Sequence, residues 1–224
     1  MKALVIGSGG AIGSAFVEVL RADPGILEVV ALGRRSDPPV DYDREETVAA
    51  AAQALRGHSP FQVVIVATGV LHTAAAQPEK RLADLQLAAM QEVFRLNTFG
   101  PALVLRHFAP LLERQRSVMA LLSARVGSIE DNRLGGWYSY RASKAALNML
   151  VKTASIELRR THPGAVVVAL HPGTVRSELS RPFRGDEIGR EAAQAAAQMW
   201  QVLQSLQPGD SGGFAAYDGQ RLPW

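Results

Sequence analysis

The sequence contains no cysteine among its 224 residues. Without a thiol the chain can form no disulfide scaffold, cysteine-ligated zinc site, iron–sulfur cluster or thiol nucleophile. Long apolar runs are also missing, because a stretch such as residues 63–71 is far shorter than the ~20 residues of a membrane helix. The apolar run that ends at Ile6 is broken by glycines too early for the hydrophobic region of a signal peptide. We therefore expect a cytoplasmic protein that does not contact membranes.

A large excess of charge of one sign is absent as well. Lys and Arg total 24 and Asp and Glu total 21, which leaves a net charge of +3, and the basic residues form no dense cluster. Nucleic-acid binding therefore has little support. The spacing of His72, His107 and His171 does not suggest a metal site. A Gly-x-Ser-x-Gly motif is missing, so a Ser-His-Asp hydrolase is not supported either.

The composition is that of a folded domain, with 47% hydrophobic and 20% charged residues. Short apolar runs, typical of strands covered on both faces, alternate with stretches rich in helix-forming residues. The expected strands are residues 3–6, 29–32, 63–66, 118–122, 165–170 and 213–217. The expected helices are residues 11–22, 45–55, 82–95, 101–114, 139–160 and 190–206. This alternation predicts an α/β fold: a single doubly wound Rossmann-type domain over residues 1–224, with about seven mostly parallel strands and helices on both faces.

A glycine-rich loop joins the first expected strand to the first expected helix. A dinucleotide site needs glycines there, because the backbone must turn tightly and approach a pyrophosphate at a helix N-terminus. A strict G-x-G-x-x-G pattern fails at Ile12, whereas G-x-x-x-G-x-G fits Gly7 and Gly13 with Ala11 at its middle glycine. A glycine-rich turn without a ligand is the alternative. The candidate binding residues are Gly7, Ser8, Gly9, Ala11, Ile12 and Gly13.

Two arginines, Arg34 and Arg35, follow the second expected strand. A site for NAD usually has an acidic residue here, which accepts hydrogen bonds from the ribose 2′-hydroxyl. Guanidinium groups instead offer charge-assisted hydrogen bonds to a 2′-phosphate, so the pair favours NADP(H) over NAD(H). A solvated basic turn is the alternative. Asp41 is a candidate for the adenine edge, although it could equally be an exposed loop residue.

Tyr140 and Lys144 are four residues apart, which places them on one face of the expected helix 139–160. A free tyrosine, with a pKa near ~10, exchanges protons poorly at neutral pH. We expect the neighbouring ammonium group to stabilise the phenolate and lower the pKa of Tyr140, as acid–base catalysis requires. A Y-x-x-x-K pair alone is a common and weak signal.

The combination and order of the motifs identify a protein family far more specifically than any single motif does. Beside the glycine loop and Tyr140/Lys144, the chain reads Gly69-Val70-Leu71-His72, Leu96-Asn97-Thr98, Gly135-Gly136-Trp137-Tyr138, His171-Pro172-Gly173-Thr174-Val175 and a C-terminal Leu222-Pro223-Trp224. Over essentially its whole length the sequence resembles the short-chain dehydrogenase/reductase family, and within it the C-factor and sniffer-like carbonyl reductase group.

The resemblance implies a role for each matching residue. Tyr140 would be the general acid or base, and Lys144 would lower its pKa and bind the nicotinamide ribose. Asn97, in a helix that is kinked in the family, would hold a water that links Lys144 to solvent. The other cofactor contacts implied are Ala67, Thr68, Gly69, Pro172, Gly173, Thr174 and Val175. Ala67 and Thr68 stand where the family usually has Asn and Ala.

The serine that binds the substrate oxygen in this family has no clear counterpart. The family pattern S-S-x-x-G reads Ser123-Ala124-Arg125-Val126-Gly127 here, with Ala124 at the active position. Ser123 is the candidate fourth catalytic residue, although successive strand residues point to opposite faces. Ser128 could reach in from the following loop. A missing donor weakens catalysis by about 2–4 kcal/mol of transition-state stabilisation without abolishing it.

These observations predict an NADP(H)-dependent oxidoreductase that acts on a small carbonyl or alcohol substrate. The alternative is a dinucleotide-binding signalling or sensor protein of the C-factor type, with weak or vestigial catalysis. The resemblance also implies a homo-oligomer, a dimer or a tetramer, assembled through the helices near 97–114 and 139–160. Residues 177–188, after the Pro-Gly turn, could form a mobile substrate lid or a plain surface loop.

Overall fold

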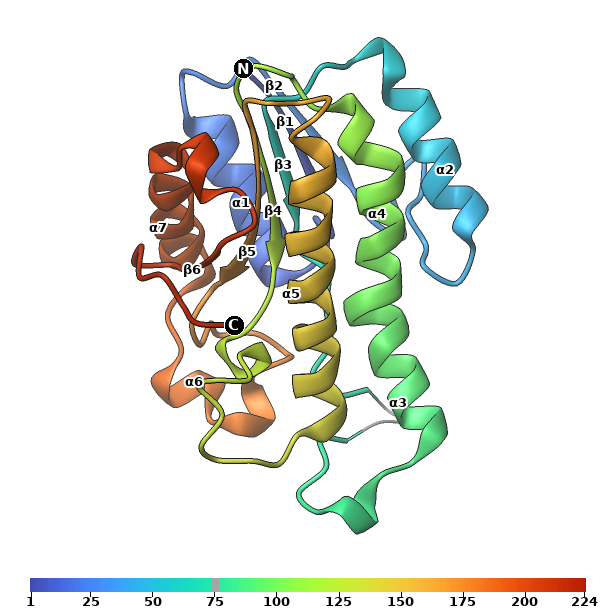
Figure 1. Ribbon diagram of the computed structural model, residues 1–224, viewed down its shortest axis with the longest axis vertical. Helices are drawn as coiled ribbons and strands as arrows, with labels where there is room; N and C mark the ends of the chain where they lie inside the picture. The colour runs from blue at the N-terminus through green and yellow to red at the C-terminus, as the bar shows by residue number, and fades with distance from the viewer. Residues whose placement is uncertain (74–76) are drawn as a thin grey trace.

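The computed structural model describes residues 1–73 and 77–224. Their strands form one parallel sheet in the order β2-β1-β3-β4-β5-β6. The strands are β1 (Lys2–Ile6), β2 (Glu28–Leu32), β3 (Val63–Val66), β4 (Ser117–Leu122), β5 (Ala165–His171) and β6 (Phe214–Ala216). The sequence prediction of a doubly wound α/β fold is confirmed (Figure 1).

The number of strands was overestimated: the described residues form six strands and not about seven. Between β2 and the next helix the chain has Pro38 and Pro39, which carry no N–H group for a strand ladder. The backbone turns instead, with Val40 N donating to Gly33 O at 2.9 Å and Ser36 Oγ donating to Pro38 O at 2.6 Å. This turn forms one wall of a cavity at the carboxyl edge of the sheet.

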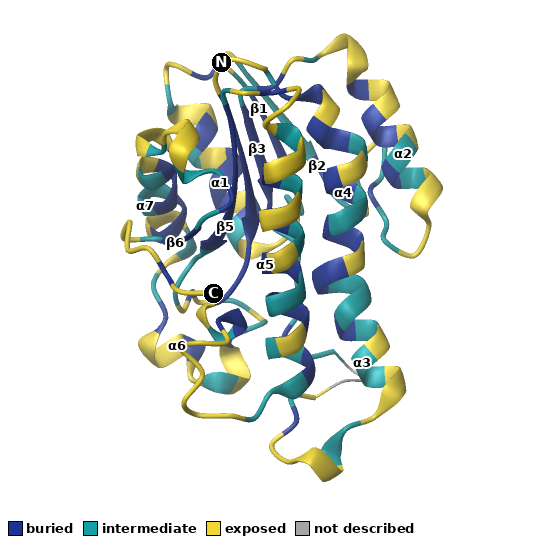
Figure 2. Ribbon diagram, in the orientation of Figure 1, coloured by how far each residue is buried: buried dark blue, intermediate teal, exposed yellow. Residues whose placement is uncertain are grey.

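Helices cover both faces of the sheet because each strand is apolar on both sides. Ala3 and Val5 of β1 pack toward α1 (Ala11–Ala22) and α7 (Ala192–Ser205). Leu4 and Ile6 belong to the opposite core, with α2 (Glu45–Ala54), α4 (Gly100–Phe108) and α5 (Tyr138–Leu158). Figure 2 shows buried strands between helices whose outer faces are exposed. Alternate strand residues thus supply two separate cores.

The expected helix at residues 82–95 is interrupted. It consists of a 3₁₀ turn (Leu82–Asp84), α3 (Leu87–Phe94) and a π-helical turn (Arg95–Phe99) that leads into α4. Residues 181–188, expected as a lid or loop, form a 3₁₀ turn (Arg181–Phe183) and the short α6 (Gly185–Ile188). Among the described helices, none has the length and apolarity to cross a membrane.

The strand order reverses at β1, since β2 lies on one side of it and β3 on the other. In doubly wound sheets, ligands bind beyond the carboxyl ends of the strands at this switch point. The segments that follow β1, β2 and β3 begin at Gly7, Gly33 and Ala67, and all three residues line one cavity. The fold therefore places a candidate ligand site at this edge of the sheet.

Candidate functional site

Two adjoining cavities lie at the carboxyl edge of the sheet. The larger, of about 850 Å³, is lined by residues 7–10, 33–36, 40–43 and 67–70, with Thr73, Glu92, Arg95 and Leu96. The smaller, of about 360 Å³, lies beside Tyr140 and Lys144 and also involves residues 122–126 and 171–175. Ala67, Thr68 and Gly69 line both. The cavities therefore form one groove, referred to below by its nucleotide end and its reactive end.

The glycine loop is shaped by close backbone packing. Gly7 has a φ of +90°, and a Cβ on Gly13 would lie 2.1 Å from Gly7 O. Gly9 has open space around it, and no described side chain caps the N-terminus of α1. The first N–H groups of a helix have no intrahelical partner and favour an anion. The loop thus fits a pyrophosphate, with Gly13 needed for the shape of the loop while lining neither cavity.

Ser8, Ile12 and Ala11 have different surroundings. The Ser8 hydroxyl donates to Leu32 O at 3.0 Å and ties the loop to the end of β2. Ile12 lines the reactive end, so its side chain lies where a nicotinamide ring would need an apolar wall. Ala11 lines neither cavity and contributes the start of α1.

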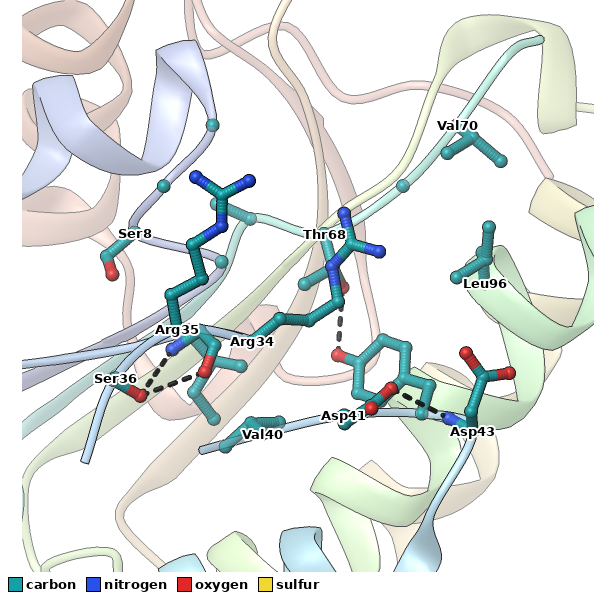
Figure 3. A pocket seen from close by; sticks show the side chains of 18 of the residues that line it. Ser8, Arg34, Arg35, Ser36, Val40, Asp41, Asp43, Thr68, Val70 and Leu96 are labelled. Carbon is teal, nitrogen blue, oxygen red and sulfur yellow. Dashed lines mark hydrogen bonds between the residues drawn. The ribbon is translucent and has the colours of Figure 1, made fainter. Parts of the chain in front are cut away.

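Arg34 and Arg35 line the nucleotide end, and both side chains are exposed. Figure 3 shows both guanidinium groups in the pocket, that of Arg35 on the side of Ser8 and that of Arg34 beside Thr68. The turn beneath them is held by Ser36, whose hydroxyl accepts from Gly33 N at 2.9 Å. Two of the three acidic residues in this cavity wall pair with other arginines, Asp41 with Arg44 and Asp43 with Arg95. Two exposed guanidinium groups therefore line the nucleotide end.

Asp41 lines the cavity, but its carboxylate is used within its own turn. It accepts from Asp43 N at 3.1 Å and from Arg44 Nε at 3.3 Å. The hydrogen bond from Asp43 N, with help from Arg44 and Arg34, holds the pKa of Asp41 below its usual value. The adjacent Tyr42 was not predicted: its hydroxyl is 2.9 Å from Thr68 Oγ1 and joins two walls of the cavity (Figure 3).

At the reactive end, Tyr140 and Lys144 lie on the first two turns of α5. Lys144 Nζ is 6.0 Å from the centroid of the Tyr140 ring and donates to Leu122 O at 2.9 Å. Burial raises the pKa of Tyr140 to about 12 and lowers the pKa of Lys144 to about 8. The shift of Tyr140 is opposite to the expected one, because loss of solvent around the phenol outweighs the ammonium group at this distance. Tyr140 is consequently a protonated acid at neutral pH.

Asn97 lies in the π-helical turn and is fully buried. Its side chain accepts from Val70 N and donates to Val70 O, both at 2.8 Å, and also donates to Ser143 Oγ at 3.1 Å. A Cβ on Gly69 would lie 3.1 Å from Lys144 Nζ and 3.2 Å from Asn97 Oδ1. Asn97 therefore joins the segment after β3 to α5, and glycine at position 69 makes room for Lys144. π turns of this kind are frequent at functional sites.

The three positions considered for the family's serine, 123, 124 and 128, have different surroundings. Ser123 is buried, and its hydroxyl donates to Asn148 Oδ1 of α5 at 2.6 Å. Ser128 Oγ accepts from Asp131 N at 3.0 Å, and Ser128 does not line the cavity. Ser123 and Ala124 both line it. The Ser123 hydroxyl is thus bound to Asn148, Ser128 lies away from the cavity, and Ala124 has no hydroxyl to offer a substrate oxygen.

The segment Pro172–Gly173–Thr174–Val175 forms a wall of the reactive end and is braced by Arg190. Arg190 Nη2 donates to Pro172 O at 2.5 Å, and Arg190 N donates to Thr174 O at 3.0 Å. Its guanidinium carbon lies 3.3 Å from the centroid of the Tyr217 ring. The neighbouring His171 is neutral at pH 7, because burial, together with Arg125 and Arg190, lowers its pKa to about 4.

Aromatic rings form one wall of the reactive end. The Trp137 ring lies 6.2 Å from the Tyr140 ring and 5.1 Å from the Phe183 ring, and His72 lies 5.9 Å from Phe183. Trp137 lines this cavity, whereas Tyr138 lines neither. Ser177, Leu179, Ser180, Phe183 and Ile188 also line it. The segment 177–188 is therefore part of the cavity wall.

Sequence reasoning missed residues that act through distant contacts. Tyr42, Glu79, Asn148 and Arg190 each join segments that are far apart in the chain. Gly100, just before the expected helix 101–114, makes room for Tyr42, since a Cβ there would lie 2.0 Å from Tyr42 Cδ2. A glycine inside a helix often has a packing reason of this kind.

Known proteins resemble this chain in sequence. A family model described as enoyl-(acyl carrier protein) reductase matches residues 27–217. The chain is 32% identical over 197 residues to 1-hydroxy-2-glutathionyl-2-methyl-3-butene dehydrogenase of Rhodococcus sp. (strain AD45), covering 88% of this chain and 84% of that protein. It is 38% identical over 145 residues to C-signal of Myxococcus xanthus, covering 64% of this chain and 83% of that protein.

Solved structures have the same architecture. An NADPH-bound carbonyl reductase from chicken fatty liver superposes with a TM-score of 0.85 at 26% identity, over 100% of this chain and 94% of that one. The carbonyl reductase Sniffer of D. melanogaster has a TM-score of 0.85 at 22% identity, over 100% and 99% of the two chains. The second likeness shows the fold alone.

Proposed function

The chain belongs to the short-chain dehydrogenase/reductase family of oxidoreductases, and from this premise we propose that it is an NADP(H)-dependent reductase of a small carbonyl substrate. The observation that carries the proposal is the continuous groove. Arg34 and Arg35 lie at one end, Tyr140 and Lys144 at the other, and residues 67–69 line both cavities. Among similar structures, a carbonyl reductase from chicken fatty liver contains NADPH.

The residues present fit a nicotinamide dinucleotide. The uncapped N-terminus of α1 suits the pyrophosphate, and the two guanidinium groups suit the 2′-phosphate. Ile12 and residues 172–175 would enclose the nicotinamide. When bound, the cofactor supplies a hydride to the carbonyl carbon.

In the reductive direction Tyr140 donates its phenolic proton to the carbonyl oxygen. At neutral pH the Tyr140 phenol carries its proton, and an acid held in position can deliver a proton in the transition state. Lys144, with a pKa lowered to about 8, is mostly charged at pH 7 and stabilises the phenolate as it forms. Asn97 holds the backbone of Val70 against α5 and so fixes the distance between this pair and the rest of the groove.

The substitution Tyr140→Phe tests this function. We expect it to lower kcat with NADPH on aldehydes, ketones or quinones about 10³-fold, since general acid catalysis contributes roughly 10²–10⁴-fold. NADPH affinity should stay within twofold of wild type, because only the hydroxyl is removed. Undiminished turnover by Tyr140→Phe would show that the mechanism is wrong.

A second candidate function is a dinucleotide-binding sensor or signalling protein with vestigial catalysis. Two observations favour it: Ala124 lines the cavity where a serine is expected, and the Ser123 hydroxyl donates its hydrogen bond to Asn148 Oδ1. One of the similar proteins is named C-signal. Tight NADPH binding by the wild type without turnover of any carbonyl compound would favour this candidate. The cytoplasmic location and the homo-oligomer stay predictions.

A further inference from the structure

The N-terminus of α5, which carries Tyr140 in its first turn, is capped from a distant segment by Glu79. Glu79 is only 5% exposed. Its Oε2 accepts from Ser139 N at 3.1 Å, and its Oε1 accepts from the Ser139 hydroxyl. Its own carbonyl oxygen accepts from Trp137 N at 2.5 Å. One residue thus binds the start of the helix through both side chain and backbone.

The chain just before α5 needs such a restraint. Gly135, Gly136 and Trp137 have φ angles of 65°, 64° and 53°, so three consecutive residues are left-handed. This conformation is easy for glycine but unfavourable for a bulky residue such as tryptophan. Arg141 supports the turn from inside the helix, with Nε donating to Gly136 O at 2.9 Å. The bond from Trp137 N to Glu79 holds the strained residue itself.

The left-handed turn 135–137 sets the position of two groups at the reactive end. It places the Trp137 ring in the cavity wall, 6.2 Å from the ring of Tyr140. It also begins the helical turn from which the Tyr140 side chain extends. A buried carboxylate at this end of the helix is favoured by the helix dipole and by two donors on Ser139.

We propose that Glu79 is a positioning residue for the reaction. It holds the turn 135–137 and the first turn of α5 in the arrangement that presents Tyr140 to the substrate oxygen. Glu79 acts only through Ser139 and Trp137, and it does not line the cavity. The inference rests on the proposed function, because it assigns Glu79 a part in proton donation by Tyr140.

The test compares Glu79→Ala with Glu79→Gln and with a matched control, Asp84→Asn. Asp84 also accepts backbone N–H bonds, from Lys80 and Arg81, but it caps the 3₁₀ turn 82–84, and among the described residues its hydrogen bonds go to residues 80 and 81 and not to α5. We expect Glu79→Ala to lower kcat about 30-fold with NADPH affinity within twofold. Glu79→Gln keeps one acceptor for Ser139 and should lose about threefold. Asp84→Asn should match wild type.

Amide hydrogen exchange gives a readout that needs no turnover. Exchange at Ser139, whose N–H donates to the Glu79 carboxylate, should accelerate more than tenfold in Glu79→Ala and stay unchanged in Asp84→Asn. Unchanged exchange, or accelerated exchange with unchanged kcat, would overturn the proposal. If Glu79→Ala does not fold, Ser139→Ala replaces it, and normal kcat in both Ser139→Ala and Glu79→Gln would overturn it. A wild type without any turnover refutes the proposed function instead, and exchange alone then decides whether Glu79 holds the turn.

Discussion

The two ends of the groove use charge in opposite ways. At the nucleotide end, Arg34 and Arg35 are exposed and come from one short segment after β2. At the reactive end, Lys144 is buried, and Leu122, Asn97 and Gly69 surround it from other elements. Exposed cations can recognise a phosphate without a change in proton affinity, whereas a buried cation has its pKa moved. The exposed end of the groove thus suits phosphate recognition, and the buried end suits acid–base chemistry.

The largest expected effect is on the pH dependence of stability, and it comes from the buried Lys144. Its pKa is about 8 in the folded chain and 10.5 in the unfolded chain, so the unfolded chain binds more protons between these values. The free energy of unfolding should therefore rise with pH from about 8 to about 10, and the burial penalty below pH 8 is about 3 kcal/mol. Above pH 10 the raised pKa of Tyr140 reverses the trend, because the unfolded tyrosine loses its proton first.

Urea unfolding between pH 7 and 10 measures this effect. Lys144→Met removes the titrating group and should abolish the rise, and it should be at least as stable as wild type at pH 7. Lys152→Met, on an exposed position of the same helix, is the control and should keep the rise. A wild type whose stability is flat over this range would contradict the buried state of Lys144.

The next effect concerns the arginine pair. We expect the double substitution Arg34→Ala/Arg35→Ala to weaken NADPH binding about 30-fold and NADH binding by less than threefold, because only NADPH carries the 2′-phosphate. Fluorescence titration with both cofactors measures the two affinities, with Arg44→Ala as a control because Arg44 pairs with Asp41. An equal loss for both cofactors would mean that the arginines do not read the 2′-phosphate.

The smallest expected effect is an increase in kcat. Ala124→Ser adds a hydroxyl where the cavity wall has a methyl group. We expect kcat for carbonyl reduction to rise about tenfold, which is less than the full contribution of an oxyanion donor, since the surrounding site is built around alanine.

Ser123→Ala should change kcat less than threefold, because the Ser123 hydroxyl is bound to Asn148. A large loss in Ser123→Ala would restore Ser123 as the missing donor.

The same contrast between the two ends explains what the sequence could predict. Arg34, Arg35 and the glycine loop are local features, and the Tyr140–Lys144 pair follows from helical spacing, so short patterns suffice for them. The pKa shifts of Tyr140 and Lys144 depend on burial by distant elements, and for Tyr140 the sequence argument gave the opposite direction.

Other features depend on tertiary contacts in the same way. Glu79 reaches Ser139 and Arg190 reaches Pro172 across loops that no periodic pattern marks. The six apolar runs expected as strands all form strands, and no segment of the sequence indicated a seventh.

The most direct test of the central claim is transfer of deuterium from NADPH labelled at C4 of the nicotinamide to a carbonyl substrate. The wild type, mixed with NADPH carrying deuterium at both C4 positions and a panel of aldehydes and ketones, should give a product alcohol with deuterium on the former carbonyl carbon. Tyr140→Phe, which retains the groove, should bind the same cofactor and give almost none. Tight NADPH binding by the wild type with no labelled product from any carbonyl compound would contradict the claim that this groove performs hydride transfer.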